Sequence, residues 1–288
     1  MSANVALRTS PSARSIPWLR IPRLPVTLWA GLIILAGWTL ATLFVPLISG
    51  RDAEAVVYGT RLLPPSPEAP FGTDSVGRDV LVRTTIGFRY DLLVSLASVL
   101  AAAVVGVLIG ALSGSGPEWL DNAVMRIIDI IASFPSFILA IIVSVALGGS
   151  IGTLIFSIAL VLLPLHARGT RAAILAERAK PYADAARAMA IPPVRIVLVH
   201  LLPNSLRPTI TQAAIDVSNA IMITAALSFL GFGIQPPTPE WGLMVNDGAA
   251  YIVNGQWWVT FFPGAAILTV VLSFFLIDLG VKNIRGDA

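Results

Sequence analysis

Six apolar stretches of about membrane length divide the chain. A transmembrane helix needs about 20 residues, because each residue advances the helix by about 1.5 Å and the hydrocarbon layer is about 30 Å thick. Backbone groups in lipid must form hydrogen bonds within their own segment, so apolar runs of this length favour helices. The pattern predicts an all-α polytopic membrane protein with six transmembrane helices, at residues 26–48, 92–113, 127–147, 151–166, 208–232 and 259–279.

The composition agrees with a membrane protein and narrows the chemistry. Hydrophobic residues make up 56% of the 288 residues and charged residues 12%, roughly half the charged fraction of a soluble domain. The chain contains no cysteine, which excludes disulfides and thiolate metal sites. The first apolar run follows a basic tail at 1–25 and is longer than the h-region of a signal peptide, about 7 to 15 residues, so we expect an uncleaved transmembrane helix.

The basic residues predict the orientation. Lys and Arg collect in cytoplasmic loops, and most of the 19 in this chain fall on the cytoplasmic side if both termini are cytoplasmic. The high isoelectric point then reflects topology and anionic lipid, not nucleic acid. Residues 92–280 form the expected permeation core, with a cytoplasmic loop at about 168–207 and a tail at 281–288. The five basic residues that do not fit lie in the external loop at 49–91: Arg51, Arg61, Arg78, Arg83 and Arg89.

A charged, alanine-rich segment stands in the cytoplasmic loop. Pro181 suits a first helical position, and the alanines that follow favour a helix. Pro192 and Pro193 lack the N–H groups of a continuing helix, so we expect a helix of about ten residues. It either fits a groove on another protein or simply lies at the surface. Its smooth face is formed by Ala179, Ala183, Ala186 and Ala190.

The same segment resembles the EAA loop of ABC importer permeases. That loop contains a Glu-Ala-Ala triplet, a glycine and an Ile-x-Leu-Pro ending. The resemblance implies that the matching residues couple the chain to a cytoplasmic ATPase, although His200 replaces the isoleucine. The matching residues are Asp184, Ala185, Ala186, Ala190, Leu202 and Pro203.

Two further stretches make the resemblance more specific. "FGTDSVGRDVLVRTTIGFRYDL" at 71–92 and "LSFLGFGIQPPTPEWGLMV" at 227–245 look like segments of the second permease subunit of dipeptide and oligopeptide importers, the DppC/OppC type. With "DNAVMRIIDI" at 121–130, the similarity covers nearly all of 71–280. It implies a type I importer permease fold in the plasma (inner) membrane of a prokaryote.

The resemblance also implies partners. Such a permease pairs with a homologous second permease, one or two cytoplasmic ATPase subunits and an external binding protein that delivers peptide. The chain would form half of the translocation path and would not itself be an enzyme. ATP and Mg²⁺ would belong to the ATPase subunits, and we expect no cofactor or metal on this chain, which has no GxxxxGK[ST] loop.

Polar residues at helical spacing suggest a route for the substrate. Buried polar groups in a membrane tend to face a bundle interior or a watery cavity. We expect two stripes to border the path, with Asp216 the first candidate to meet a peptide's amino terminus. Alternatively they bond to neighbouring helices, and Asp129 pairs with Arg126. The stripes are Ser205, Thr209, Gln212, Asp216 and Asn219 on the fifth run, and Asp129, Ser133 and Ser136 on the third.

Aromatic residues gather in the last external segments. Trp241, Trp257 and Trp258, with Phe261 and Phe262, suit an interfacial aromatic belt. The alternative is a role for the tryptophans in an external gate or in contact with the binding protein. Within 71–91, apolar residues are compatible with a short helix at the outer surface.

The sequence also bears on three alternative functions: import of another cargo, secondary transport and hydrolysis. The same architecture imports nickel, haem or glutathione in some systems, and the residues do not separate these cargoes. A stand-alone secondary transporter is less well supported, because the chain shows no internal repeat and few intramembrane carboxylates. A hydrolase is not supported, since neither a GxSxG nor an HExxH signature occurs.

Overall fold

The computed structural model describes residues 24–57 and 59–285, and over these residues the chain is helical, with one isolated β-bridge between Thr73 and Asp79. The predicted tail at 1–25 therefore lies outside the described residues except for its last two, and the tail at 281–288 lies partly outside. Among these described residues, five helices are long and apolar enough to cross a membrane. They are α1 (Val26–Ser49), α2 (Val80–Ser115), α5 (Ile151–Arg178), α9 (Arg207–Phe229) and α11 (Trp258–Arg285).

The third predicted span is not one straight helix. It consists of α3 (Glu118–Ser133) and α4 (Ser136–Leu147), which meet at an angle of 91°. Pro135 lacks an N–H donor, and Phe134 before it is extended, with φ −80° and ψ 138°. α4 is only about 18 Å long, too short to cross the hydrocarbon layer by itself. The prediction of a single helix at 127–147 is wrong, because Pro135 divides this segment into two helices.

The segment before the second apolar run also differs from expectation. Residues from Val80 onward are the first turns of α2, not a separate surface helix within 71–91. The Asp79 carboxylate caps this helix by accepting hydrogen bonds from Leu81 N (2.9 Å) and Val82 N (3.1 Å). No proline follows before Pro117, so one helix of 36 residues continues from the external loop through the membrane.

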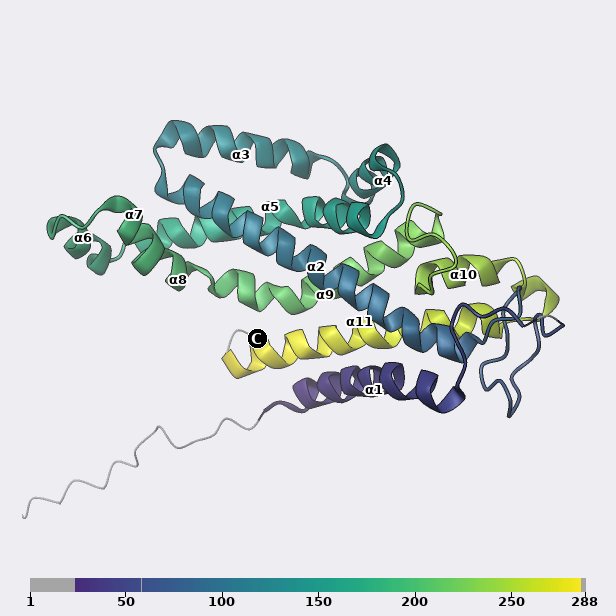
Figure 1. Cartoon of the computed structure of the whole chain (residues 1–288). Helices are drawn as coiled ribbons and strands as arrows, with labels where there is room; N and C mark the ends of the chain where they lie inside the picture. Colours follow the sequence, from purple (N-terminus) through teal and green to yellow (C-terminus); the bar gives the residue numbers. More distant parts are fainter. Residues whose placement is uncertain (1–23, 58, 286–288) are drawn as a thin grey trace, which may run out of the picture.

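The helices form a bundle whose two ends carry different short elements. α2, α5 and α9 lie at the centre, α1 and α11 run side by side along one flank, and α3 lies on the other (Figure 1). At one end, near the start of α1 and the end of α11, lie α6 (Pro181–Ala188), α7 (Pro193–Arg195) and α8 (Leu202–Ser205). The external loop and α10 (Trp241–Ala249) lie at the opposite end.

Three glycines allow α2 and α5 to pack closely. Gly106, Gly110 and Gly114 recur at four-residue steps on α2, so they lie on one face. A Cβ atom at Gly106 would lie 2.5 Å from the Cβ of His166, and one at Gly110 would lie 2.4 Å from the carbonyl oxygen of Ala167. Small residues at such spacing let helix backbones approach in membranes. The α2–α5 contact therefore depends on glycine.

The substitution Gly110→Ala tests this contact. We expect it to lower the free energy of unfolding by about 2 kcal/mol, because the added methyl group meets backbone atoms of α5 that cannot move aside. The matched control is Gly37→Ala on α1, where a Cβ atom meets nothing within 4 Å. Thermal unfolding in detergent, followed by tryptophan fluorescence, should show a lower Tm for Gly110→Ala alone. Equal Tm values for the two variants would contradict the close approach.

Candidate functional site

The alanine-rich helix α6 is anchored to the bundle by one face. Ala183 and Ala186 are buried and pack against Ile174 of α5 and against Ile196 and Leu201, which follow in the chain. The structure thus confirms a short helix that begins at Pro181. The expected smooth outer face is wrong at Ala183 and Ala186, because these two methyl groups face the chain's own core.

The outward face of α6 is polar and small. The Asp184 side chain is 69% exposed and pairs with Arg187, with Oδ1 and Nη1 2.5 Å apart. Arg187 also donates a hydrogen bond to the carbonyl of Arg178 at 3.0 Å, and Ala185 is exposed. Among the other residues matched to the EAA loop, Ala190 and Pro203 are exposed, Leu202 is half-buried and Ala186 is buried.

The end of α6 is a Schellman motif with alanine in the place where glycine is usual. Ala190 N donates to Arg187 O at 2.9 Å, and Ile191 N donates to Ala186 O at 3.3 Å. Ile191 then packs against the cluster that contains Ala186. Ala190 has φ +56°, in the left-handed region where a Cβ atom is unfavourable. The turn after α6 therefore keeps a glycine-type geometry without glycine.

We expect Ala190→Gly to stabilise the last turn of α6 by about 0.5–1 kcal/mol, since it removes the left-handed Cβ penalty and this gain exceeds the added flexibility of the unfolded chain. The matched control, Ala188→Gly inside α6, should destabilise the helix by about 1 kcal/mol. Hydrogen exchange of the α6 amides measures both effects. Faster exchange in both variants would contradict the strained geometry of Ala190.

The polar stripe expected on the fifth run faces α5 for most of its length. Asp216 is fully buried, with its Oδ2 3.2 Å from Nε2 of His166, although the geometry is not that of a hydrogen bond. Gln212 Nε2 donates to Asp216 Oδ1 at 3.3 Å. The Thr209 and Thr170 hydroxyls lie 3.3 Å apart. The structure thus brings the residues from Thr209 to Asp216 together at the α5–α9 crossing.

The two ends of the stripe lie apart from this crossing. Ser205 is buried in α8, before α9 begins, and its hydroxyl donates to Leu201 O at 2.8 Å. Asn219, one turn beyond Asp216 on α9, is exposed. The helical spacing therefore predicted the residues that meet at the crossing, but not which residues at the two ends of the stripe lie outside it.

The three polar positions predicted on the third run, Asp129, Ser133 and Ser136, are exposed. Asp129 pairs with Arg168 of α5 at 2.6 Å, and not with Arg126 on its own helix. Ser133 donates to Ile130 O at 2.7 Å, and Ser136 is the first residue of α4. The two serines therefore flank the 91° bend between α3 and α4.

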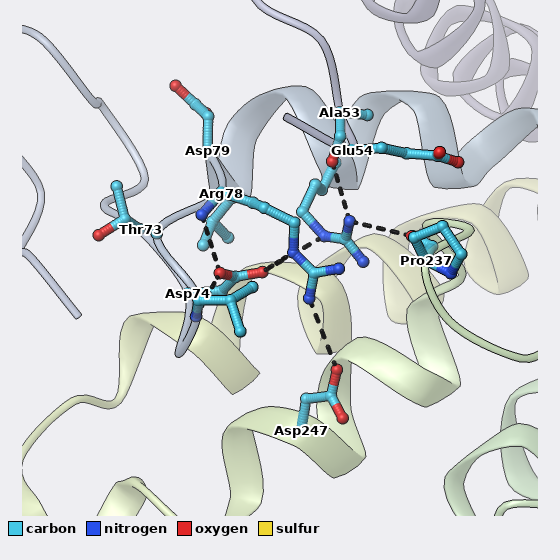
Figure 2. Close-up of polar contacts among 12 residues, drawn as sticks. Ala53, Glu54, Thr73, Asp74, Arg78, Asp79, Pro237 and Asp247 are labelled. Atoms are coloured by element: carbon cyan, nitrogen blue, oxygen red, sulfur yellow. Dashed lines mark hydrogen bonds and ion pairs between the residues drawn. The ribbon is translucent and has the colours of Figure 1, made fainter. Parts of the chain in front are cut away.

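A buried ionic cluster fixes the external loop (Figure 2). The Asp74 carboxylate accepts a hydrogen bond from Arg78 Nε at 2.6 Å and lies 3.6 Å from Arg83 Nε. Arg83 also donates to the carbonyls of Ala53 (2.9 Å) and Pro237 (3.2 Å). These contacts join the external loop and the start of α2 to the segment that precedes α10.

The cluster also reaches α10 itself. Nη2 of Arg78 lies 4.0 Å from the carboxylate of Asp247 (Figure 2). Burial raises the pKa of Asp247, and the two arginines oppose this effect. The external loop, the start of α2 and α10 are therefore linked by charge as well as by packing.

Two of the three tryptophans predicted to lie in an aromatic belt are buried. Trp241 is fully buried, donates from Nε1 to Thr84 O at 2.8 Å, and packs against Trp38 and Phe88. Trp258 is buried and donates to Thr73 O at 3.2 Å. The aromatic-belt interpretation is wrong for these two residues. Trp257 is 50% exposed, so it alone of the three presents much surface, and its external contact stays a prediction.

Two features of these sites were not found by sequence reasoning. His166 lies outside the two predicted polar stripes, but it is buried opposite Asp216. Asp74 and Arg83 belong to the stretch at 71–92 that carries the resemblance, but the sequence predicted no role for either residue. The arginines of the external loop that do not fit the orientation rule could have indicated this ionic cluster. Two of them, Arg78 and Arg83, lie there because they pair with the buried carboxylate of Asp74.

The fold and these sites define a polytopic, all-helical membrane protein of the transport type, with polar groups inside its bundle and a short anchored helix at one end. A model of the family described as binding-protein-dependent transport system inner membrane component matches residues 106–282. The chain belongs to this family.

Curated relatives and a solved structure agree with this assignment. The probable D,D-dipeptide transport system permease protein DdpC of Escherichia coli is 38% identical over 260 residues, which cover 90% of this chain and 87% of the relative. The dipeptide transport system permease protein DppC of Alkalihalophilus pseudofirmus is 38% identical over 253 residues, or 88% and 83% of the two chains. A chain of the inward-facing MetNI methionine ABC transporter shares the fold, with a TM-score of 0.55 at 23% identity over 73% of this chain and 96% of the other.

Proposed function

We propose that this chain is the permease subunit of an ATP-driven ABC importer of dipeptides or oligopeptides. The relatives with 38% identity are named for dipeptide transport, which supports the cargo. The observation that carries the coupling role is α6, which is held to the bundle by two buried alanines and presents Asp184 and Ala185 outward. A helix fixed on one side and free on the other suits docking into a groove of an ATPase subunit.

In this mechanism the coupling is mechanical. ATP binding and hydrolysis move the docked α6, and the packed core beneath it passes this movement to α5 as a rigid-body shift, because packed interfaces do not deform continuously. A homologous second permease completes the path, and an external binding protein delivers peptide. ATP and Mg²⁺ belong to the ATPase subunits, and both termini of the chain face the cytoplasm with α6.

The polar positions named above border the path in this proposal. Asn219 and the exposed residues Asp129, Ser133 and Ser136 are available to substrate or to the second permease. Asp216 is reached only through the α5–α9 crossing, where Gln212 and His166 stand beside it.

Uptake of radiolabelled dialanine tests the function. The chain is reconstituted in proteoliposomes with its native neighbours and the loaded binding protein. We expect uptake that requires ATP and persists when ion gradients are collapsed. Uptake driven by an ion gradient without ATP would favour a secondary transporter, and ATP-driven uptake of nickel, haem or glutathione in place of dialanine would correct the cargo.

A further inference from the structure

A hollow of about 90 Å³ opens where α5 crosses α9. Leu165 and Pro208 at its rim are exposed, whereas His166 at its wall is buried. The hydroxyls of Thr170 and Thr209 meet at 3.3 Å along one side. The full lining is Leu165, His166, Gly169, Pro208, Thr209 and Gln212.

The crossing contains buried polar atoms without hydrogen-bond partners. Nε2 of His166 and Oδ2 of Asp216 face each other at 3.2 Å, and neither forms a hydrogen bond. Gln212 gives its amide N–H to Asp216, which leaves its carbonyl oxygen free to accept from the hollow. Unpaired buried polar groups are costly, so such a site favours a ligand that donates hydrogen bonds.

The charge of the crossing points to a cation. Asp216 is the acidic residue of the crossing, and no Lys or Arg is among the residues that line the hollow. The nearest basic residues of α5 are already paired, Arg168 with Asp129 at 2.6 Å and Arg171 with Asp121 through two hydrogen bonds. The α2 segment at 101–112, which covers His166 from behind, carries no charged residue. Among the described residues, the basic side chain within ion-pair distance of Asp216 is that of His166, and no Lys or Arg forms an ion pair with it.

We propose that this hollow is an ammonium subsite on the translocation path, which receives the amino terminus of a passing peptide. Thr209 and Gln212 contact the ammonium group, and Asp216 behind them supplies the negative field. The volume corresponds to roughly three water-sized groups, which suits an ammonium head but not a whole peptide. The identity of the ligand as peptide rests on the proposed function.

The absence of cysteine from the chain allows a direct test. Thr209→Cys places a thiol at the hollow, and the control Ile210→Cys places one on the neighbouring residue, which is 59% exposed and does not line the hollow. The complex with its native neighbours, in lipid nanodiscs, is treated with a cationic aminoethyl or an anionic sulfonatoethyl methanethiosulfonate. Mass spectrometry of this chain gives both labelling rates.

We expect the ratio of cationic to anionic rates to be at least about tenfold higher at Thr209→Cys than at Ile210→Cys, the effect of one nearby charge at intermediate dielectric. Asp216→Asn should remove this difference, whereas Gln212→Met, which leaves the carboxylate of Asp216 in place, should keep it. Dialanine should slow the cationic labelling of Thr209→Cys, and N-acetyl-dialanine should not.

Equal rate ratios at the two positions would overturn the subsite. Charge selectivity without protection by dialanine would overturn the peptide as its ligand. The labelling needs no ATP hydrolysis. Equal rate ratios in a complex that still shows ATP-driven uptake would therefore reject the subsite and leave the importer function standing. Charge selectivity without any ATP-driven uptake rejects the importer function instead.

Discussion

Replacement of Asp74 by alanine is expected to lower the free energy of unfolding by about 3–5 kcal/mol, the cost of removing one partner from a buried ion pair. The side chains of Arg78 and Arg83 are only 9% and 1% exposed. Without the carboxylate these two positive charges are left close together and poorly solvated. Alanine also removes the acceptor for the N–H groups of Val76 and Arg78, at 3.0 and 2.9 Å.

Two matched variants separate the causes of this loss. Asp74→Asn keeps an oxygen for both N–H groups and removes only the charge, so it should fall between wild type and Asp74→Ala. Asp52→Ala removes an exposed carboxylate from the same loop and should change the stability by less than about 0.5 kcal/mol. Thermal unfolding in detergent measures all three variants. A Tm of Asp74→Ala equal to that of Asp52→Ala would show that the cluster does not hold the external loop.

Ala185→Trp is expected to reduce ATP-driven uptake at least about a hundredfold, although the chain still folds into its helical bundle. Ala185 lies on the exposed face of α6, so the indole does not disturb the core formed by Ala183 and Ala186. It would instead obstruct a close-packed docking surface, and a loss of about 3 kcal/mol of binding energy corresponds to more than a hundredfold in affinity.

The control for this variant is Ala36→Trp, which adds the same side chain to an exposed position on α1. Asp184→Arg, which reverses a charge on the docking face, should also impair uptake. Initial rates at saturating ATP and loaded binding protein, with Tm values measured in parallel, give the comparison. Normal uptake by Ala185→Trp would mean that this face of α6 does not dock.

The long helices could be predicted because lipid sets a simple rule of length and polarity. Five of the six apolar runs are single helices. Four of them match or extend the expected ranges, and α9 ends at Phe229, before the end of the expected 208–232. The start of α6 was also predictable, since Pro181 is suited to a first helical turn and little else there competes with it. The long helices and the start of α6 were predictable because each depends on the residues of its own segment.

The failures have a common cause in contacts between distant residues. Hydropathy averages over a window, so it did not register that Pro135 divides a span into two helices at 91°. Trp241 fits both a membrane interface and a core, and only the positions of Trp38 and Phe88 decide in favour of the core. The alanines of α6 could face either way until Ile174 was placed beside them.

The polar crossing was only half predictable. The spacing from Thr209 to Asp216 identified one face of α9 but not its partner. His166 lies on another helix, and its position opposite Asp216 follows from the close approach of α2 to α5 at Gly106. The glycines at 106, 110 and 114 were the available signal, because their spacing marks the face of α2 that another helix approaches.

Co-purification with ATPase activity tests the coupling role most directly. The tagged chain is expressed with its native neighbours, purified in mild detergent and assayed for ATP hydrolysis with and without peptide-loaded binding protein. The proposed function predicts that ATPase subunits co-purify, that their turnover rises with the loaded binding protein, and that Ala185→Trp abolishes this rise while Ala36→Trp does not. Purification of the chain without any ATPase, or a rise that Ala185→Trp leaves unchanged, would contradict coupling through α6.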